Sequence, residues 1–351
     1  MSKSFGKSIQ LWIAIALCTL LAGIASAQVS GKWTKAAPFP EPSEELYSIV
    51  ANGRLYVFGG YANRAPKGLV FEYDPAADKW TRKKNMALPA HHTALATLNG
   101  KIYVFGGYAA SNTSTPGWLP IDNTWEYEPA ADTWKALAPL PFARGSAVAY
   151  EHKGRIYVIG GNGMHPGVKA ASLWADHPQR SFGDVDEYDP AANSWRARAP
   201  MPTPRNHMFG GIVDGKIYVI GGRLGPAFIG AATNVDIVEQ YDPETDAWGA
   251  PQPRMPTARS GGGAAVYNGR IYVAGGEQQD LRMFAAFRAF EAFDPKTQTW
   301  TSMPVMPTPR HGFAAAFIGN GFHVVSGETQ AAGTGVSGAT TAHDVFEVKS
   351  P

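Results

Sequence analysis

The chain has 351 residues, of which 44% are hydrophobic and 17% are charged, with a formal net charge of +2 at pH 7. This composition is typical of a globular protein with a sizeable core and argues against a disordered chain. Beyond the first 27 residues, basic and acidic residues balance at 29 each, so a broad basic surface for nucleic acid or anionic membrane is unsupported.

The first 27 residues have the pattern of a secretory signal peptide. Lys3 and Lys7 precede a mostly apolar run over 9–24, and Ala25-Ser26-Ala27 forms an A-x-A cleavage site. An uncleaved membrane anchor is the alternative. We expect cleavage after Ala27, a periplasmic or secreted mature chain over 28–351, and no membrane span after cleavage, because no later segment is long and apolar enough to cross a bilayer.

A repeat begins soon afterwards, in which a β-rich run ends at a glycine pair. The copies are LYVFGG at Leu55–Gly60, IYVFGG at Ile102–Gly107, IYVIGG at Ile156–Gly161, IYVIGG at Ile217–Gly222, IYVAGG at Ile271–Gly276 and the degenerate FHVVSG at Phe322–Gly327. The β-branched and aromatic runs favour buried strands. The glycines suit strand ends where Cβ atoms would crowd or φ must be positive.

Two further marks follow each of the five clear copies. The first is an aromatic–acid–Pro step, at Tyr73-Asp74-Pro75, Tyr127-Glu128-Pro129, Tyr188-Asp189-Pro190, Tyr241-Asp242-Pro243 and Phe293-Asp294-Pro295. The second is a tryptophan a few residues later, at Trp80, Trp134, Trp195, Trp248 and Trp300. Each unit thus offers four short strands, which cannot form a stable sheet alone. We assign these tryptophans to the core and not to a ligand platform.

The sixth unit has a strand at Asp344–Val348, but the chain ends before its tryptophan. A spare tryptophan, Trp33, precedes the first unit. We therefore predict that Gly31–Thr34 is the outer strand of the sixth unit. Pairing the first strand with the last would close the ring and remove an exposed edge.

Five near-complete copies and one split copy, at a period near 50 residues, resemble the kelch motif. The resemblance covers about 31–348. It implies an all-β fold, a six-bladed kelch β-propeller in a single domain over 28–351, and a monomer. It says little of function, because propellers host many unrelated functions.

The face that binds is predicted from loop lengths. The loops after the glycine pairs are long, whereas the opposite turns, such as Asn52-Gly53 and Asn99-Gly100, are two-residue hairpins. Long loops on a rigid scaffold commonly carry function. Residues at the start of each innermost strand should lie on the same face as these loops. The candidate ligand-binding residues are Glu45, His92, Arg144, Arg205, Asn206, His207, Arg223, Arg259, Ser260, Arg310, His311 and Glu328.

Arginine-rich candidates favour a ligand with acidic groups, because guanidinium groups bind carboxylates and phosphates through two parallel hydrogen bonds. An exported binding protein for a protein or glycan ligand is therefore the first functional hypothesis. The alternative for each arginine is structural, since Pro-x-Arg at this point belongs to the kelch pattern and can bridge blades. By resemblance to kelch proteins that bind acidic peptides, Asn206, His207, Ser260 and His311 are the contacts expected.

An enzyme is the second hypothesis. The segment Gly276-Glu277-Gln278-Gln279-Asp280-Leu281-Arg282, together with Gly327-Glu328-Thr329, is similar to segments of exported N-acetylneuraminate epimerases (mutarotases). The resemblance implies Glu277 as acid or base and Arg282 as the carboxylate-binding residue. The gap between the two is one residue shorter here, and the segment falls in a different blade.

Neither a cofactor nor a metal site is predicted. Copper oxidases with kelch repeats need a Cys–Tyr cross-link, and Cys18, the only cysteine, lies in the signal peptide. A site built from His92, His207, His311 and Glu45 is conceivable, but these residues belong to different blades.

Overall fold

The computed structural model describes residues 30–110, 118–165, 179–227, 233–279, 283–331 and 338–349. All regular structure in these ranges is β-strand. The described part of the chain has no helix long and apolar enough to cross a membrane. The prediction of an all-β fold is confirmed, and the details below concern how its sheets position the site.

The described residues form six antiparallel four-stranded sheets and the connections between them. The first three are β2 (Glu44–Ala51), β3 (Arg54–Ala62), β4 (Ala65–Asp74) and β5 (Lys79–Arg82); β7 (Ala94–Leu98), β8 (Lys101–Phe105), β11 (Thr124–Glu128) and β12 (Thr133–Ala136); and β13 (Val148–His152), β14 (Arg155–Ile159), β17 (Val185–Asp189) and β18 (Ser194–Arg198). The others are β19 (Phe209–Val213), β20 (Lys216–Ile220), β23 (Val238–Asp242) and β24 (Ala247–Trp248); β25 (Gly263–Tyr267), β26 (Arg270–Ala274), β29 (Phe290–Asp294) and β30 (Thr299–Ser302); and β31 (Ala314–Ile318), β32 (Gly321–Val325), β33 (His343–Lys349) and β1 (Ser30–Lys35).

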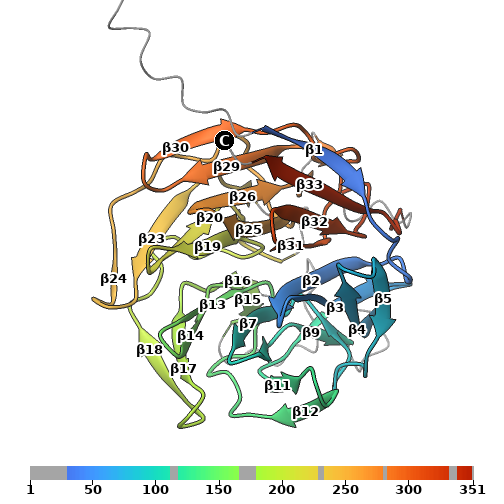
Figure 1. The fold of residues 1–351 in the computed structure, drawn as a ribbon. Helices are drawn as coiled ribbons and strands as arrows, with labels where there is room; N and C mark the ends of the chain where they lie inside the picture. The colour runs from blue at the N-terminus through green and yellow to red at the C-terminus, as the bar shows by residue number, and fades with distance from the viewer. Residues whose placement is uncertain are drawn as a thin grey trace, which may run out of the picture.

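The sheets follow one another around a common centre (Figure 1). The innermost strands touch in the order β2, β7, β13, β19, β25 and β31, and β31 in turn touches β2. Apolar side chains from neighbouring sheets form the core between them; one such cluster joins Phe58 and Val70 of the first sheet to Val104 and Tyr127 of the second.

The N-terminal strand β1 lies at the outer edge of the sheet that contains the C-terminal strand β33. The two strands pair antiparallel over their length, with Trp33 opposite Phe346 (Figure 1). The Trp33 ring lies 5.2 Å from the ring of Phe346 and 5.4 Å from that of Phe290 in the preceding sheet. The predicted partner of the N-terminal strand is therefore the one observed.

The repeat tryptophans tie each sheet to the linker that precedes it. Each indole Nε1 donates a hydrogen bond to a backbone carbonyl: Trp80 to Ala37, Trp134 to Lys84, Trp195 to Ala138, Trp248 to Ala199, Trp300 to Pro253 and Trp33 to Pro304. A polar handle of this kind is usual for a partly buried tryptophan. The same interaction thus recurs at all six sheets.

The aromatic–acid–Pro step ends the third strand of a unit and leads into a turn. In four units the tyrosine hydroxyl donates to an Asp or Asn five residues later: Tyr73 to Asp78, Tyr127 to Asp132, Tyr188 to Asn193 and Tyr241 to Asp246. These Asp and Asn residues adopt a positive φ, which they tolerate better than most residues. The step is therefore structural, as predicted.

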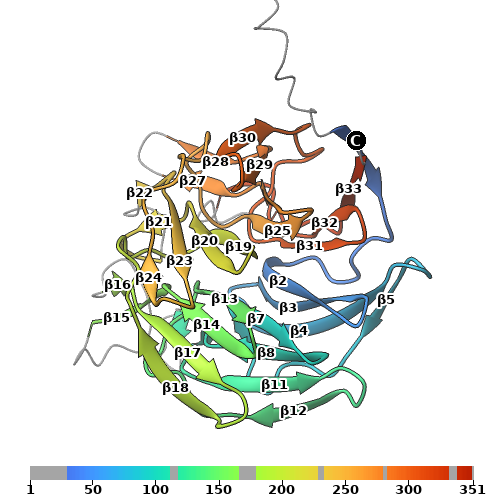
Figure 2. The same cartoon turned by 60° about the vertical axis from the view of Figure 1, so that its left-hand side comes forward.

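Four smaller sheets are formed by the loops after the glycine pairs, one of them together with the short strand β6. They comprise β6 (Ala90–His91), β9 (Tyr108–Ala110) and β10 (Trp118–Pro120); β15 (Asn162–Met164) and β16 (Gln179–Ser181); β21 (Arg223–Leu224) and β22 (Thr233–Asn234); and β27 (Glu277–Gln279) and β28 (Phe284–Ala286). The three two-stranded sheets lie on one side of the larger sheets in Figure 2. The long loops thus fold back over one face of the molecule.

Candidate functional site

The chain turns sharply at the start of each innermost strand, on the face of the long loops. One residue per sheet there has a φ between 53° and 67°, namely Glu45, His92, Ser146, His207, Gly261 and Gly312. A non-glycine residue in this conformation is strained, and such strain tends to gather at functional sites. The six residues surround the axis, where successive innermost strands approach one another.

Backbone hydrogen bonds connect these residues from sheet to sheet. Ser146 N donates to His92 O (2.9 Å), His207 N to Ser146 O (3.1 Å), Gly261 N to His207 O (3.1 Å), Gly312 N to Gly261 O (2.7 Å) and Leu46 N to Gly312 O (3.0 Å). The side chains of this ring therefore have fixed positions over the axis. A cavity of about 150 Å³ extends along the axis between the innermost strands and reaches Ser146, His207 and Gly261.

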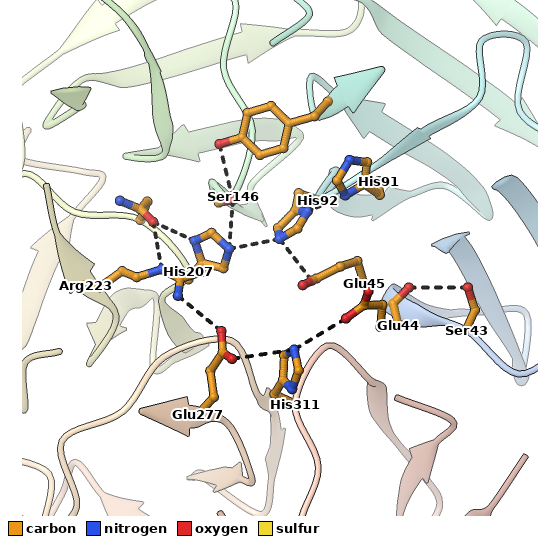
Figure 3. A network of polar contacts seen from close by, with 12 residues as sticks. Ser43, Glu44, Glu45, His91, His92, Ser146, His207, Arg223, Glu277 and His311 are labelled. Atoms are coloured by element: carbon orange, nitrogen blue, oxygen red, sulfur yellow. Dashed lines mark hydrogen bonds and ion pairs between the residues drawn. The ribbon is translucent and has the colours of Figure 1, made fainter. Parts of the chain in front are cut away.

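Seven ionisable side chains converge over this ring, and we call them the axial cluster (Figure 3). The members are Glu44, Glu45, His92, His207, Arg223, Glu277 and His311. Apart from Glu44, each residue is 5% exposed or less. Charged groups are rarely buried to this degree without partners, so their contacts decide what the site can do.

Two histidines form one side of the axial cluster. His92 Nε2 lies 2.9 Å from His207 Nε2 and 2.9 Å from a carboxylate oxygen of Glu45. The other nitrogen of His207 contacts Asn206 Oδ1 at 2.5 Å, and the other nitrogen of His92 contacts His91 Nδ1 at 2.6 Å. Both imidazoles are thus held in place from both ends.

Carboxylates, Arg223 and His311 form the opposite side. Arg223 Nη1 donates to Glu277 Oε1 at 3.1 Å. His311 Nε2 lies 3.6 Å from an oxygen of Glu277 and 3.6 Å from an oxygen of Glu44. These residues come from the first, fourth, fifth and sixth sheets and their loops, so only the folded ring brings them together.

Burial and charge shift the pKa values of these groups in opposite directions. Burial lowers the pKa values of His92 and His207 well below the usual range, so these imidazoles are neutral. Burial would also lower the pKa of His311, but the carboxylates of Glu277, Glu44 and Glu45 more than offset it and raise that pKa to about 10. Burial raises the pKa of Glu45 to about 7. The site therefore holds acid and base forms side by side at neutral pH.

Four of the predicted ligand-binding arginines do not reach this cluster. Arg144, Arg205, Arg259 and Arg310 are 1% exposed or less, and each forms an ion pair with an acid on the third strand of its own sheet. The partners are Asp186, Glu239, Glu291 and Asp344. Arg205 and Arg259 also donate to three backbone carbonyls each.

The expectation that these four arginines gather at the mouth is therefore corrected. Their ion pairs lie within one sheet, and a ligand could engage these guanidinium groups fully only by breaking buried ion pairs. These contacts favour the structural alternative, but each arginine braces its own blade and does not bridge to a neighbouring one through its ion pair.

The remaining predicted residues lie in or beside the axial cluster, with one exception. Asn206 and Arg223, Ser260 and Glu277, and His311 and Glu328 face each other as isolated β-bridges. Asn206 contacts His207, and Ser260 and Glu328 are buried behind the cluster. The exception, Arg282, lies outside the described residues.

Three residues of the site were not predicted from the sequence as ligand-binding residues. Glu44 belongs to the cluster, His91 contacts His92, and the Ser146 hydroxyl lies 3.4 Å from His207 Nε2. Glu44 and His91 directly precede the predicted residues Glu45 and His92, and Ser146 occupies in the third unit the position that His92 has in the second. Extending the alignment to all three residues at each strand start would have found them.

Together, the sheets and the repeated contacts define a kelch-repeat β-propeller. A family model described as the KLHDC2/KLHL20/DRC7 Kelch-repeats domain matches residues 91–327, and a Kelch motif model matches residues 48–87. The chain therefore belongs to the kelch-repeat family, whose domains are typically protein-binding.

Curated relatives share the repeat over part of their length. The chain is 27% identical over 325 residues to the Kelch-like protein terF of Aspergillus terreus, covering 92% of this chain and 56% of that protein. It is 30% identical over 212 residues to Kelch-like protein 25 of Xenopus tropicalis, covering 58% of this chain and 32% of that protein. The chain thus spans about half or less of the length of these relatives.

A solved structure agrees with the fold. The structure of YjhT superposes with a TM-score of 0.72 and 17% identity, over 90% of this chain and 99% of that one. At this level of identity the likeness shows the fold alone.

Proposed function

We propose that this protein is an exported six-bladed propeller, closed by β1, that binds a ligand on its long-loop face at the axial cluster. The six four-stranded sheets, the circular contacts of their innermost strands and the pairing of β1 with β33 support the closed ring. The pattern of residues 1–27 supports export through a cleaved signal peptide. Sequencing the N-terminus of the protein from the periplasm and the medium tests the export: Gln28 should be the first residue.

The convergence of buried ionisable side chains from five sheets over the axis carries the binding proposal. Burying so many charges is costly, and a scaffold alone has no need of it. Among the described residues, Ser260 Oγ and both ring nitrogens of His311 are buried there without a direct hydrogen-bond partner. Such atoms are satisfied when a ligand supplies the missing donors and acceptors.

The chemistry of the cluster favours a ligand that donates hydrogen bonds. The four bracing arginines are neutralised within their own sheets, so the acidic ligand that they suggested loses its main support. Three glutamates face one guanidinium and one imidazolium in the axial cluster. Hydroxyl-rich glycans, or protein segments with hydroxyl and amine groups, match this excess of acceptors.

Probing a glycan array and a peptide array with the mature chain, residues 28–351, tests this proposal. We expect captured ligands that Glu277→Gln releases and that the control variant Glu126→Gln retains, because Glu126 lies on the third strand of the second sheet and pairs with Lys101 far from the axis. Failure to capture any ligand, or capture that Glu277→Gln leaves unchanged, would contradict it.

A sugar isomerase is the second candidate, and the contact between Glu277 and Arg223 favours it. A buried carboxylate beside a guanidinium and an imidazolium is suited to move a proton at an anomeric hydroxyl while the cations hold a substrate carboxylate. This candidate gives Arg223 the carboxylate-binding role that the resemblance implied for Arg282.

NMR exchange spectroscopy of sialic acid anomers tests the second candidate. Wild-type protein should accelerate the exchange, and Glu277→Gln and Arg223→Gln should abolish the acceleration. An exchange rate equal to that in buffer alone rejects the isomerase and leaves the binding proposal intact.

A further inference from the structure

The axial cluster contains a set of side chains of the types that bind metal ions. One ligand atom each from Glu44, Glu45 and His311 lies within 4.8 Å of the others. An oxygen of Glu277 lies 3.6 Å from His311 Nε2, opposite the oxygen of Glu44 at the same distance. Figure 3 shows the three carboxylates and the imidazole pointing toward one another.

These separations match a metal coordination sphere. Bonds of about 2.1 Å to nitrogen and oxygen in a tetrahedral site place neighbouring ligand atoms about 3.4 Å apart. Hydrogen-bonded partners lie closer, at about 2.7–3.2 Å. At 3.6 Å from two carboxylates, His311 Nε2 is therefore too far for a hydrogen bond to either, but at a distance that a shared cation bridges.

His311 supplies a second observation that points to a ligand. It is fully buried, and neither of its ring nitrogens has a hydrogen-bond partner among the described residues. Its contacts to Glu44 and Glu277 are ion pairs at 3.6 Å and not direct hydrogen bonds, so a ligand bonded to Nε2 would supply the interaction that this buried nitrogen lacks. The Nε2 atom faces the three carboxylates, which is the orientation of a metal ligand.

Carboxylates outnumber cations in the axial cluster among the described residues. Glu44, Glu45 and Glu277 face the Arg223 guanidinium, which pairs with Glu277, and the His311 imidazolium. The guanidinium groups of Arg259 and Arg310 are paired inside their own sheets. A divalent cation would neutralise the carboxylates and displace the His311 proton to bind the nitrogen.

We propose that Glu44, Glu45 and His311 form a site for one divalent transition-metal ion, Zn²⁺ or Mn²⁺, with Glu277 beside it. The imidazole ligand disfavours Mg²⁺ and Ca²⁺, which prefer sets of oxygen ligands. The ligands come from the first and sixth sheets, so the ion would also link parts of the ring that are distant in sequence. This inference is independent of which ligand the long-loop face binds.

Isothermal titration of the metal-free mature chain with ZnCl₂, MnCl₂, MgCl₂ and CaCl₂ tests the proposal, together with elemental analysis of the protein as purified. We expect one Zn²⁺ or Mn²⁺ per chain and a rise in melting temperature, with little response to Mg²⁺ or Ca²⁺. Glu44→Gln should weaken binding at least roughly tenfold, the smaller effect known for residues around a metal site, and His311→Ala should abolish it.

His152→Ala is the matched control. It removes another histidine next to a glutamate, Glu244 at 2.7 Å, but on the outer surface. Binding unchanged in Glu44→Gln but lost in His152→Ala would identify a surface site and overturn the proposal. Absence of binding in the wild type would overturn it as well and leave His311 as a fixed cation for the three carboxylates. Glu44→Gln keeps the test valid if His311→Ala fails to fold, because the Glu44 side chain is 23% exposed.

Discussion

Trp33 Nε1 donates a hydrogen bond to the carbonyl oxygen of Pro304 at 2.9 Å, although 271 residues separate them. The bond has the same form as those of the five repeat tryptophans, each of which reaches back to the linker before its own sheet. The N-terminal strand thus makes the contacts of an outer strand in the sixth sheet. If the ring is closed in this way, residues at the start of the mature chain hold the whole domain together.

The first prediction follows from this contact. Trp33→Ala should lower the free energy of unfolding by about 3 kcal/mol, the lower end of the cost of such truncations, because the indole is partly exposed. Urea unfolding followed by tyrosine and tryptophan fluorescence measures the loss. Lys32→Ala is the control in the same strand, since the Lys32 side chain is 65% exposed and its removal should cost less than about 0.5 kcal/mol. Equal stability of the two variants would contradict closure by β1.

The second prediction concerns the bracing arginines. Arg205→Gln should destabilise the fold by about 3–5 kcal/mol, because it leaves Glu239 without its charged partner inside the sheet. Arg155→Gln should cost no more than about 1 kcal/mol, since this arginine is 42% exposed and its pair with Asp189 is solvated. Thermal unfolding by circular dichroism compares the two. A normal melting temperature for Arg205→Gln, with loss of ligand capture, would instead return Arg205 to the binding site.

The structural role of these arginines has a signal within the sequence itself. In the four units with arginine, an acid stands two residues before the aromatic of the third strand: Asp186, Glu239, Glu291 and Asp344. In the other two units Ser43 and Ala90 replace the arginine, and Phe71 and Trp125 replace the acid. The two positions change together because they touch across one sheet. Comparison of the units with one another thus separates the bracing residues from the rest.

Much of the remaining fold, and most members of the axial cluster, were open to sequence reasoning. Strand ends follow from glycine pairs and from Tyr-Asp-Pro steps because the repeat presents each pattern several times. Alignment of the units likewise places Glu45, His92 and His311 at strand starts on one face. The distance between Glu44 and Glu277, in contrast, depends on how far each sheet twists and tilts toward the axis. The contacts within the cluster are therefore visible only in three dimensions.

The third prediction uses two glycines at equivalent positions of the axial ring. A Cβ on Gly312 would lie 2.8 Å from the backbone nitrogen of Glu45, whereas a Cβ on Gly261 would meet nothing closer than Glu277 Oε1 at 3.6 Å. Both have positive φ, so both alanine variants bear the cost of a left-handed residue, about 1–2 kcal/mol. Gly312→Ala should cost a further 1–3 kcal/mol or so from overpacking. Urea unfolding should rank Gly261→Ala above Gly312→Ala in stability; the reverse order would show that the two turns differ from the geometry described.

The fourth prediction concerns acid and two buried histidines near the junction of the sixth and first sheets. His323 Nδ1 lies 2.8 Å from His343 Nε2, and His343 Nδ1 lies 3.1 Å from the carbonyl oxygen of Ala37. Burial, with the neighbouring imidazole, lowers the pKa of His323 to about 3, and burial lowers the pKa of His343 to about 4. In the unfolded chain both imidazoles have a pKa of about 6.5.

Since the folded-state pKa values lie below the unfolded value, the unfolded chain binds more protons between pH 6.5 and pH 4. Stability should therefore be full above pH 6.5 and fall as the pH decreases through this window, by on the order of 2 kcal/mol per imidazole at pH 5. Urea unfolding at pH 7.5 and pH 5 measures the loss.

The double variant His323→Gln/His343→Gln should lose less stability over the same interval than the wild type. The surface variant His152→Gln should lose as much as the wild type, because the buried pair is intact in it. An identical loss in the double variant would assign the acid sensitivity to His91, His92 and His207, whose pKa values are also lowered by burial.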